Sequence, residues 1–421
     1  MARTELAHGR QASPCIPGDE IMTIPLAARP GIEQNEAAAP TTHWGGVFAM
    51  TLCVFALIAS EFMPVSLLTP MAADLRVSEG LAGYGIAISG ALAVLTSLSI
   101  SALAGGMDRK TLLLGLTGLM ALSGAVVALA PNYPTYMVSR ALIGVVIGGF
   151  WSMSAATAMR LVPAAQVPRA LAIFNGGNAL ATVIAAPLGS YLGSIIGWRG
   201  AFGCLIPVAV VAFIWQWAAL PAITATRAAD SGNVFRLLKR RTVALGMAAC
   251  GTFFMGQFVL FTYVRPFLET VAHVDVSTLS LILLGIGLAG FVGTTIVGAF
   301  LKTGLYRTLI IIPLLMAAIA LSLIPFGAWV GAVAVLLGLW GLLATAAPVG
   351  WWSWIAQVLP KDAEAGGGLM VAVIQLAIAL GSTIGGALFD GAGYQASFMA
   401  SAAVLLLAAF LSWMTSRSQS T

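Results

Sequence analysis

The chain has 421 residues, of which 59% are hydrophobic and only 8% are charged, and its formal net charge is +5. A soluble domain carries about a quarter charged residues, so this chain has too few to cover a water-facing surface. Apolar runs of about 20 residues recur along it, each long enough to cross roughly 30 Å of hydrocarbon. The composition therefore excludes a soluble protein and indicates a membrane protein.

Residues 1–43 differ in kind from the rest. They contain five prolines, mixed charges and no apolar run long enough for the core of a signal peptide. We expect a disordered cytoplasmic tail here, with Met22 as an alternative start of translation.

Twelve apolar spans follow the tail, which predicts an all-α integral membrane protein with twelve transmembrane helices. The spans lie at 45–70, 81–104, 111–131, 134–160, 169–195, 200–220, 243–267, 277–301, 308–327, 330–356, 366–389 and 395–414. We expect a six-helix bundle at 44–220, a cytoplasmic linker at 221–242, a second bundle at 243–414 and a short cytoplasmic tail at 415–421.

The lysines and arginines set the predicted orientation. Sixteen of them lie in the tails, the linker and one set of loops, whereas only Arg76, Arg199 and Arg265 fall in the opposite loops. Basic residues are concentrated on the cytoplasmic side of membrane proteins. Both termini are therefore expected inside, at the inner membrane of a bacterium.

The two halves of the chain repeat one another. Pro163 and Pro360 each end a span and are 197 residues apart, and Gly189, Leu192, Gly197 and Phe202 match Gly385, Leu388, Gly393 and Phe398 at an offset of 196. The fold is therefore expected to contain two six-helix pseudo-repeats. Parallel repeats of this kind place a binding site at the interface of the halves, near the middle of the membrane.

Glu61 is an acid near the middle of the first span, and Pro64 and Pro70 follow it. Charged residues at membrane depth are costly and are mostly functional. Burial disfavours the charged carboxylate, so the side chain can take up and release a proton near neutral pH. The alternative is a neutral acid that donates a hydrogen bond to a neighbouring helix.

Arg140 lies at the start of the fourth span, and small residues follow it at intervals of four, including Gly144 and Gly148. An arginine keeps its charge, so it must meet a carboxylate, carbonyl groups or water. The stripe of small residues allows a neighbouring helix to approach closely. The alternative is an arginine whose head group reaches the nearby membrane interface.

The fifth span carries a longer stripe of small residues, from Gly177 to Gly197, with Pro187 within it. Such a helix suits packing that rearranges, and simple close packing is an equally good explanation. The loop Gly105–Lys110 contains Asp108 and Arg109, whose charge pairing would suit a cytoplasmic gate, although basic residues are common in inner loops.

Polar amides and aromatic rings in the spans are candidates for ligand binding. Asn175, Asn178, Gln257 and Gln375 each carry a donor and an acceptor that suit a hydroxyl group or the edge of a base. Trp151 offers a surface on which a planar ligand can stack. Taken singly, each amide is better explained as a contact between helices, and the ring of Trp151 as part of the core or the lipid-facing belt. Taken together, they favour a neutral, polar ligand. The four cysteines and three histidines show no spacing typical of a metal site.

The motifs resemble those of the major facilitator superfamily, in its proton-coupled drug and sugar efflux branch. Gly105–Lys110 resembles the loop motif after the second helix, and Arg140, Gly144 and Gly148 resemble the fourth-helix motif. Residues 186–189 resemble the fifth-helix motif of antiporters, with alanine in place of the usual glycine. The runs 61–72, 148–155, 159–163, 261–266, 348–351 and 371–376 resemble the bacterial purine ribonucleoside efflux pumps.

The resemblance covers roughly residues 42–413 and implies export of inosine-like and guanosine-like nucleosides, and of purine-base analogues, in exchange for protons. Glu61 would carry the proton, and Arg140 would influence its proton affinity or the conformational equilibrium. Trp151, Asn175, Asn178, Gln257 and Gln375 would contact the substrate, and Asp108 and Arg109 would hold the gate. No cofactor, metal, nucleic acid or obligate protein partner is implied, because the proton gradient supplies the energy.

Three alternatives remain open at this stage. A sugar or drug exporter of the same branch would share most of these motifs. A membrane enzyme would usually display clustered His, Asp or Cys residues, which the sequence does not contain. A sensor that does not transport would normally need a signalling domain, and the tail and linker are too small and polar for one.

Overall fold

The structure is a computed structural model and describes residues 42–104, 107–163, 166–223, 234–360 and 362–419. Nearly all of these residues are helical, and none of them forms a strand. They belong to one contact unit, Pro40–Thr421. The predicted tail therefore lies outside the described residues except for its last two.

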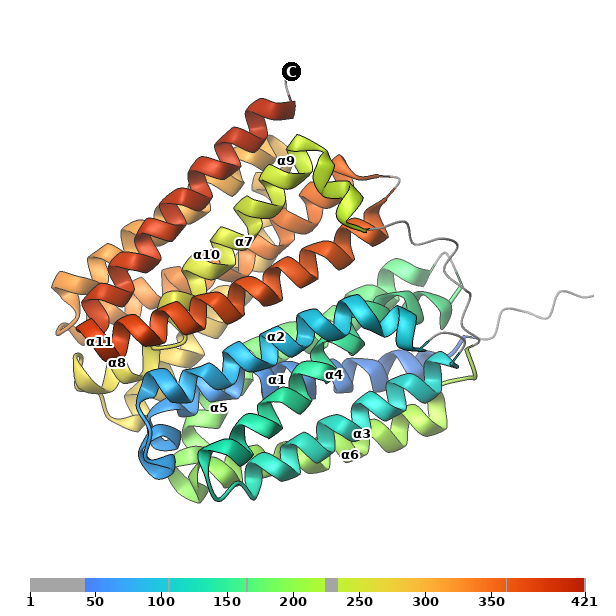
Figure 1. Cartoon of the computed structure of the whole chain (residues 1–421), viewed down its shortest axis with the longest axis horizontal. Helices are drawn as coiled ribbons and strands as arrows, with labels where there is room; N and C mark the ends of the chain where they lie inside the picture. Colours follow the sequence, from blue (N-terminus) through green and yellow to red (C-terminus); the bar gives the residue numbers. More distant parts are fainter. Residues whose placement is uncertain (1–41, 105–106, 164–165, 224–233, 361, 420–421) are drawn as a thin grey trace, which may run out of the picture. The chain divides into compact units, whose positions relative to one another are not determined.

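The helices follow one another with short connections (Figure 1). They are α1 (Trp44–Leu75), α2 (Glu79–Ala104), α3 (Arg109–Ala128), α4 (Tyr133–Arg160), α5 (Val167–Gly203), α6 (Leu205–Ala219), the short 3-10 helix η2 (Val234–Lys239), α7 (Arg241–Phe261), α8 (Val264–Thr270), α9 (Val276–Phe326), α10 (Val330–Val358) and α11 (Ala363–Gln419).

Nine helical stretches in the described part of the chain are long and apolar enough to cross a membrane. Three of them, at Arg169–Ala219, Val276–Phe326 and Ala365–Ser418, contain 51 to 54 residues, about twice the length that one crossing needs. Each of the three contains a glycine with non-helical backbone angles. Because each contributes two crossings, the predicted twelve-helix architecture is confirmed.

Gly197 in α5 and Gly393 in α11 break their helices at equivalent places in the two halves. Their φ angles are 75° and 78°, in the left-handed region that glycine adopts without steric cost. They are also 196 residues apart, the offset of the sequence repeat. The pseudo-repeat thus has a counterpart in the backbone, whereas the bounds of the two bundles, 44–220 and 243–414, and of the linker stay a prediction.

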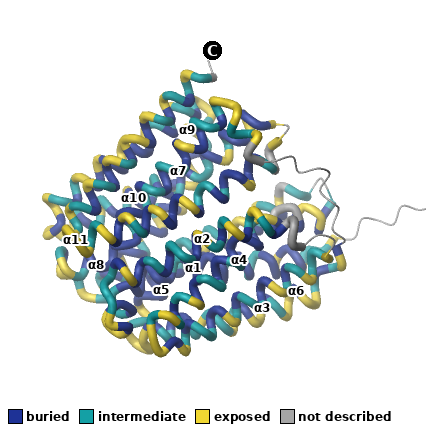
Figure 2. The backbone as a smooth tube through the Cα atoms, in the orientation of Figure 1, coloured by how far each residue is buried: buried dark blue, intermediate teal, exposed yellow. Residues whose placement is uncertain are grey.

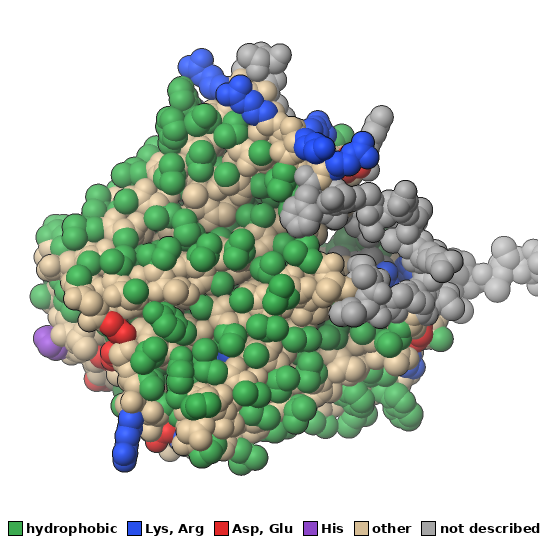
Figure 3. All heavy atoms as spheres, viewed as in Figure 1, with side chains coloured by type: hydrophobic (Ala, Val, Ile, Leu, Met, Phe, Trp, Pro, Cys, Tyr) green, Lys and Arg blue, Asp and Glu red, His purple; other side chains and the backbone are tan. Residues whose placement is uncertain are grey.

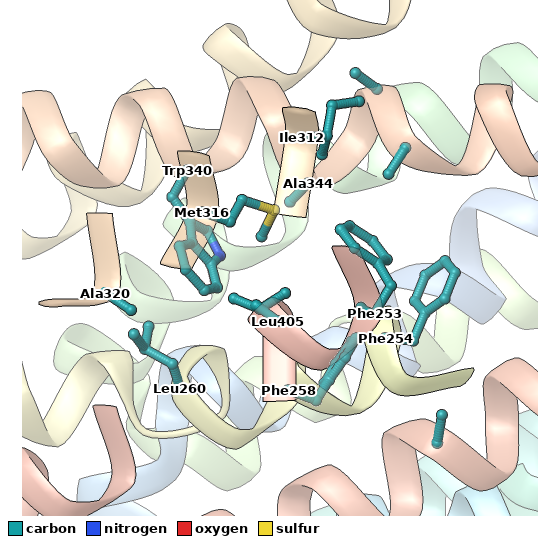
Figure 4. Close-up of a cluster of buried hydrophobic side chains, with 14 of the residues drawn as sticks. Phe253, Phe254, Phe258, Leu260, Ile312, Met316, Ala320, Trp340, Ala344 and Leu405 are labelled. Carbon is teal, nitrogen blue, oxygen red and sulfur yellow. The ribbon is translucent and has the colours of Figure 1, made fainter. Parts of the chain in front are cut away.

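The largest apolar core lies in the second half of the chain, where α7, α9, α10 and α11 contribute buried side chains. Figure 4 shows Met316, Trp340 and Leu405 converging there, with Phe253 and Phe258 of α7 beside them. Buried residues line the contacts between helices, and exposed ones lie on their outer faces (Figure 2).

The outer faces of the helices are apolar as well. Leu281 and Val335, for example, are 65% and 64% exposed. In Figure 3, hydrophobic side chains spread over the visible face, and the charged ones gather mostly at its margins. Exposed apolar surface of this extent suits a lipid environment and not water.

Glycines allow two pairs of helices to pack backbone to backbone. A Cβ atom added at Gly144 or Gly148 of α4 would lie 2.3 or 2.2 Å from a carbonyl oxygen of α2. In the same way, a Cβ atom at Gly177 of α5 would lie 2.3 Å from the carbonyl oxygen of Thr51 in α1. The predicted small-residue stripes therefore serve close helix packing.

The position of Arg265 differs from its expected place in an outer loop. It lies in the short helix α8, with only 5% of its surface exposed. Arg241–Thr270 is one stretch long and apolar enough to cross a membrane, in agreement with the seventh span at 243–267, but its helix is interrupted after Phe261. Pro266 explains the break, because it has no N–H to donate to the carbonyl of Thr262.

We expect Gly148→Ala to destabilise the fold, because the new methyl group would meet the carbonyl oxygen of Ala93 at 2.2 Å. Overpacking of this kind costs about 1–3 kcal/mol. The thermal unfolding midpoint of the purified protein, followed by tryptophan fluorescence, should fall. Gly115→Ala on α3 is the matched control, since a Cβ atom there meets nothing within 4 Å. Equal midpoints for the two variants would contradict the packing argument.

Candidate functional site

Two prolines in α1 each leave one backbone carbonyl without its helical partner. In an α-helix the N–H of residue i donates to the carbonyl of residue i−4, and proline has no N–H. Pro64 therefore frees the carbonyl of Ser60, and Pro70 frees that of Ser66. Within a membrane such a carbonyl must find another donor.

Arg140 of α4 supplies that donor at Ser60. Its Nη1 donates to the carbonyl of Ser60 at 2.9 Å, and its Nη2 lies 3.4 Å from the carbonyl of Glu61. Its Nε and Nη2 also donate to Gly85 and Ser89 of α2, each at 3.3 Å. The guanidinium is only 1% exposed, so Arg140 is a buried junction between α1, α2 and α4.

The carboxyl group of Glu61 is hydrogen-bonded to the second half of the chain, whereas Arg140 binds the backbone carbonyls of Ser60 and Glu61. Glu61 is 6% exposed, and the Nε2 of Gln375 in α11 donates to its Oε1 at 3.3 Å. A charge buried this deeply is costly unless it is hydrogen-bonded. The Glu61–Gln375 pair is therefore a buried polar contact between the two halves of the chain.

Aromatic rings lie close to this pair. Phe62 of α1 stacks on Phe258 of α7, with ring centroids 6.0 Å apart and an interplanar angle of 27°. The two rings are 196 residues apart, so they are equivalent in the repeat, and Glu61 is equivalent to Gln257. The Oε1 of Gln257 is buried without a hydrogen-bond partner among the described residues. This acceptor is available to a ligand donor.

The other predicted binding residues lie on the first half. Trp151 of α4 packs edge-on against Phe174, with centroids 6.3 Å apart. Asn175 of α5 is exposed, and its side chain donates to the carbonyl of Leu171 at 2.9 Å, while Asn178 is half-buried. The structure thus brings Glu61, Arg140 and Gln375 together at one place, and it leaves Asn175 hydrogen-bonded to its own helix.

The predicted gate residues lie at the start of α3. The Oδ1 of Asp108 accepts a hydrogen bond from the backbone N–H of Ile223 at 2.6 Å, and the N–H of Arg109 donates to the carbonyl of Ile223 at 3.0 Å. These bonds join the start of α3 to the chain after α6. Gly105 and Gly106 of the same loop lie outside the described residues, and the gating role stays a prediction.

Several polar residues that the sequence reasoning did not select also join the helices. Arg265 and Glu269 of α8 are mutually paired at 2.8 Å, and Arg265 also donates to the freed carbonyl of Ser66. Asp390 of α11 accepts from Ser78 and from the N–H of Gly80 beside α2. The position of Pro70, four residues after Ser66, was the sequence signal for the first of these contacts.

The titratable side chains do not cluster as metal ligands would. Among the described residues, no group of three His, Cys, Asp or Glu side chains is arranged to hold a metal ion. Cys53 and Cys250 are buried in separate halves, and Cys204 is exposed. The candidate site consists of Glu61, whose carboxyl group binds the amide of Gln375, and Arg140, which binds the backbone of α1 beside it.

Comparison with known proteins shows the family to which the chain belongs. The model of the Major Facilitator Superfamily matches residues 50–367. A Pseudomonas aeruginosa protein named Transcription regulatory protein OpdE is 66% identical over 389 residues, which cover 91% of this chain and 97% of that protein. A Salmonella enteritidis protein named Purine ribonucleoside efflux pump NepI is 42% identical over 369 residues, which cover 88% of this chain and 93% of that protein.

A solved structure agrees at the level of the fold. The crystal structure of the nucleoside transporter NupG superposes with a TM-score of 0.72 at 12% sequence identity, and the match covers 88% of this chain and 98% of that one. Together with the twelve membrane crossings and the family match, these findings identify the chain as a multi-pass membrane protein of the Major Facilitator Superfamily, a family of transporters.

Proposed function

We propose that the protein exports purine ribonucleosides such as inosine and guanosine, and purine-base analogues, in exchange for protons. The observation that carries the proposal is the buried contact between Glu61 of α1 and Gln375 of α11, which joins a proton acceptor to an amide on the other half. The 42% identity to a purine ribonucleoside efflux pump supports the substrate class.

The coupling follows from the hydrogen-bonding abilities of the two side chains. A charged carboxylate only accepts hydrogen bonds, so it holds the NH₂ group of Gln375 and leaves the amide oxygen free to accept from a nucleoside. A protonated Glu61 donates instead. The amide then turns its oxygen to Glu61 and presents its NH₂ group, so a donor on the nucleoside loses its partner. Proton uptake therefore releases substrate, which is the requirement of an antiporter.

The remaining residues complete this proposal. Trp151 offers its ring to the base, and Asn175, Asn178 and Gln257 offer hydrogen bonds to the ribose or the base edge. Arg140 binds the backbone carbonyls before and after the Cα atom of Glu61, those of Ser60 and of Glu61 itself, which keeps the carboxyl group facing the second half. Asp108 and Arg109 hold the cytoplasmic gate. No cofactor is needed, because the proton gradient drives the exchange.

The proposed location is the bacterial inner membrane with both termini in the cytoplasm. The support is the distribution of lysine and arginine, sixteen on the predicted inner side and three on the predicted outer side. Export of a neutral nucleoside against one entering proton moves net charge, so the membrane potential contributes to the driving force.

One relative is named for transcription regulation, and transport can account for such an effect. A carrier that lowers the cytoplasmic concentration of a nucleoside changes gene expression wherever that nucleoside is a signal, without touching nucleic acid itself. We therefore assign transport as the activity and place any effect on transcription downstream of it. A regulatory role without transport would leave the protein unable to move inosine in liposomes.

Glu61→Gln should reduce the rate of inosine movement driven by a pH gradient in proteoliposomes at least tenfold, because the amide cannot release a proton. Exchange of labelled for unlabelled inosine should persist, since it needs no net proton transfer. Glu79→Gln, at the start of α2, is the control and should behave as the wild type. Gradient-driven movement that survives in Glu61→Gln would remove this residue from its role. No inosine movement by folded wild-type protein would reject the nucleoside as substrate.

A membrane potential alone should drive nucleoside accumulation. With one proton per nucleoside, 100 mV supplies about 2.3 kcal/mol, which sustains a concentration ratio of about fiftyfold. The measurement is labelled inosine at steady state in proteoliposomes with a potassium diffusion potential and no pH difference. Accumulation that responds to a pH difference and not to the potential would mean an electroneutral exchange.

Gln375→Leu should weaken inosine binding about tenfold, or about 1.4 kcal/mol, through the loss of one hydrogen-bonding amide. It should also flatten the pH dependence, which in the wild type takes the form of tighter binding at pH 8 than at pH 6. Thr383→Val on the same helix is the control, because its hydroxyl donates only to its own helix, at Ala379, 2.8 Å away. Wild-type affinity and pH dependence in Gln375→Leu would exclude the amide as the coupling element.

A further inference from the structure

The second freed carbonyl of α1, that of Ser66, is bound by an arginine from the other half of the chain. Arg265 of α8 donates through Nη1 to this carbonyl and lies 3.4 Å from Oγ of Ser190 in α5. Ser66 and Ser190 are fully buried, and Arg265 is 5% exposed. A buried cation therefore joins α8 of the second half to α1 and α5 of the first.

The partners of Arg265 differ from those of Arg140 in one decisive way. All the groups that Arg140 binds belong to α1 and α2, in the same half as Arg140 itself. Arg265 instead divides its donors between the first half and Glu269, one turn away on its own helix, at 2.8 Å. Arg265 therefore keeps an anionic partner when the halves separate, whereas separating Arg140 from its partners would leave a buried charge unpaired.

A second contact joins the halves near the end where α1 finishes at Leu75 and α2 begins at Glu79, which is the predicted outer end. Asp390 of α11 accepts from the hydroxyl of Ser78 and from the N–H of Gly80 at 3.0 Å. The backbones are in close contact here, because a Cβ atom at Gly80 would lie 2.7 Å from the carbonyl oxygen of Gly386. Only glycine permits this approach of α2 to α11.

The ring of Tyr263 lies beside the close approach of α2 to α11. It stacks on Phe389 with centroids 5.3 Å apart, and its hydroxyl donates to the carbonyl of Ser382 at 2.8 Å. A Cβ atom at Gly83 of α2 would lie 2.2 Å from that hydroxyl oxygen. Tyr263 precedes Arg265 by two residues, so the same turn between α7 and α8 places both side chains against the first half.

We propose that Arg265 and Asp390 form an outer latch, which holds the carrier closed at the predicted outer end and must open in every transport cycle. Alternating access requires contacts between the halves to break on one side and form on the other. The latch suits this task because Arg265 remains paired with Glu269 when the halves separate. The carbonyl of Ser66 can then accept a hydrogen bond from water in place of Arg265. Arg265 is thus a positioning residue. The inference needs only the alternating access of the superfamily, and it does not depend on the nucleoside as substrate.

The test measures how fast a cysteine behind the latch reacts. Ala72→Cys, on α1 in the buried cluster that contains Tyr263 of the second half, in a chain whose four native cysteines are replaced by alanine, is treated with a water-soluble maleimide in detergent. Adding Arg265→Gln should raise the labelling rate at least tenfold, because the halves separate more often, and Asp390→Ala should also raise it, because it removes the hydrogen bonds to Ser78 and Gly80.

Arg199→Gln is the matched control. Arg199 is also an arginine at the predicted outer end, but its partners, Asp74 and the carbonyl of Ala130, belong to the same half as itself. It should leave the labelling rate unchanged. The proposal would be overturned if Arg265→Gln were labelled at the wild-type rate, or if the labelling rate rose equally in Arg265→Gln and Arg199→Gln.

A variant that fails to fold does not leave the question open. If Arg265→Gln is not recovered as a monodisperse protein, Asp390→Ala decides the matter by the same measurement, because it removes both acceptors of the second contact. An unchanged rate in that variant overturns the proposal. Because no substrate is present, the result is separate from the outcome of the inosine assays.

Discussion

The arrangement of the site depends on one missing hydrogen bond, between Pro64 and the carbonyl of Ser60. In water such a carbonyl would be hydrated, but in the interior of a membrane protein it needs a donor from another helix. Arg140 provides that donor at 2.9 Å and reaches α2 with the rest of its guanidinium. The proline thus explains both the buried arginine and the fixed position of the helix turn that carries Glu61.

From that fixed turn, the carboxyl group of Glu61 reaches the opposite half. In our proposal, the contact with Gln375 transmits the protonation state of Glu61 to the second half. When the carboxyl group changes from an acceptor to a donor, the amide of Gln375 rotates to present its oxygen instead of its NH₂ group. No movement of charge over a long distance is needed. The proposed coupling of proton to substrate is therefore a local exchange of hydrogen-bond donor and acceptor. It takes place at the interface between the halves, on which alternating access depends.

Two arginines, Arg140 and Arg265, bind backbone carbonyls of α1 but differ in their other partners. Both occupy carbonyls freed by proline, at Ser60 and Ser66. Arg140 has all its partners in its own half. Arg265 instead bridges the halves and is also paired with Glu269 on its own helix. The repeat itself does not produce this difference, since Glu61 is matched by Gln257 and Arg265 by Thr69 at the offset of 196 residues. The repeat therefore accounts for the shared fold of the halves, and the polar residues that differ between them make the different contacts.

Hydrophobic segment lengths and the repeat determined the twelve crossings, because a membrane imposes a length on each helix and excludes unpaired backbone. The isolated charges Glu61 and Arg140 were equally visible in the sequence, since a charge within an apolar run is rare for energetic reasons. Only the tertiary structure decided that Gln375 binds Glu61, that Arg140 binds carbonyls and not a carboxylate, and that Arg265 is buried. Each of these contacts joins residues at least 79 positions apart in the chain. Local patterns cannot specify which polar groups meet, because that depends on how helices far apart in sequence rotate and cross.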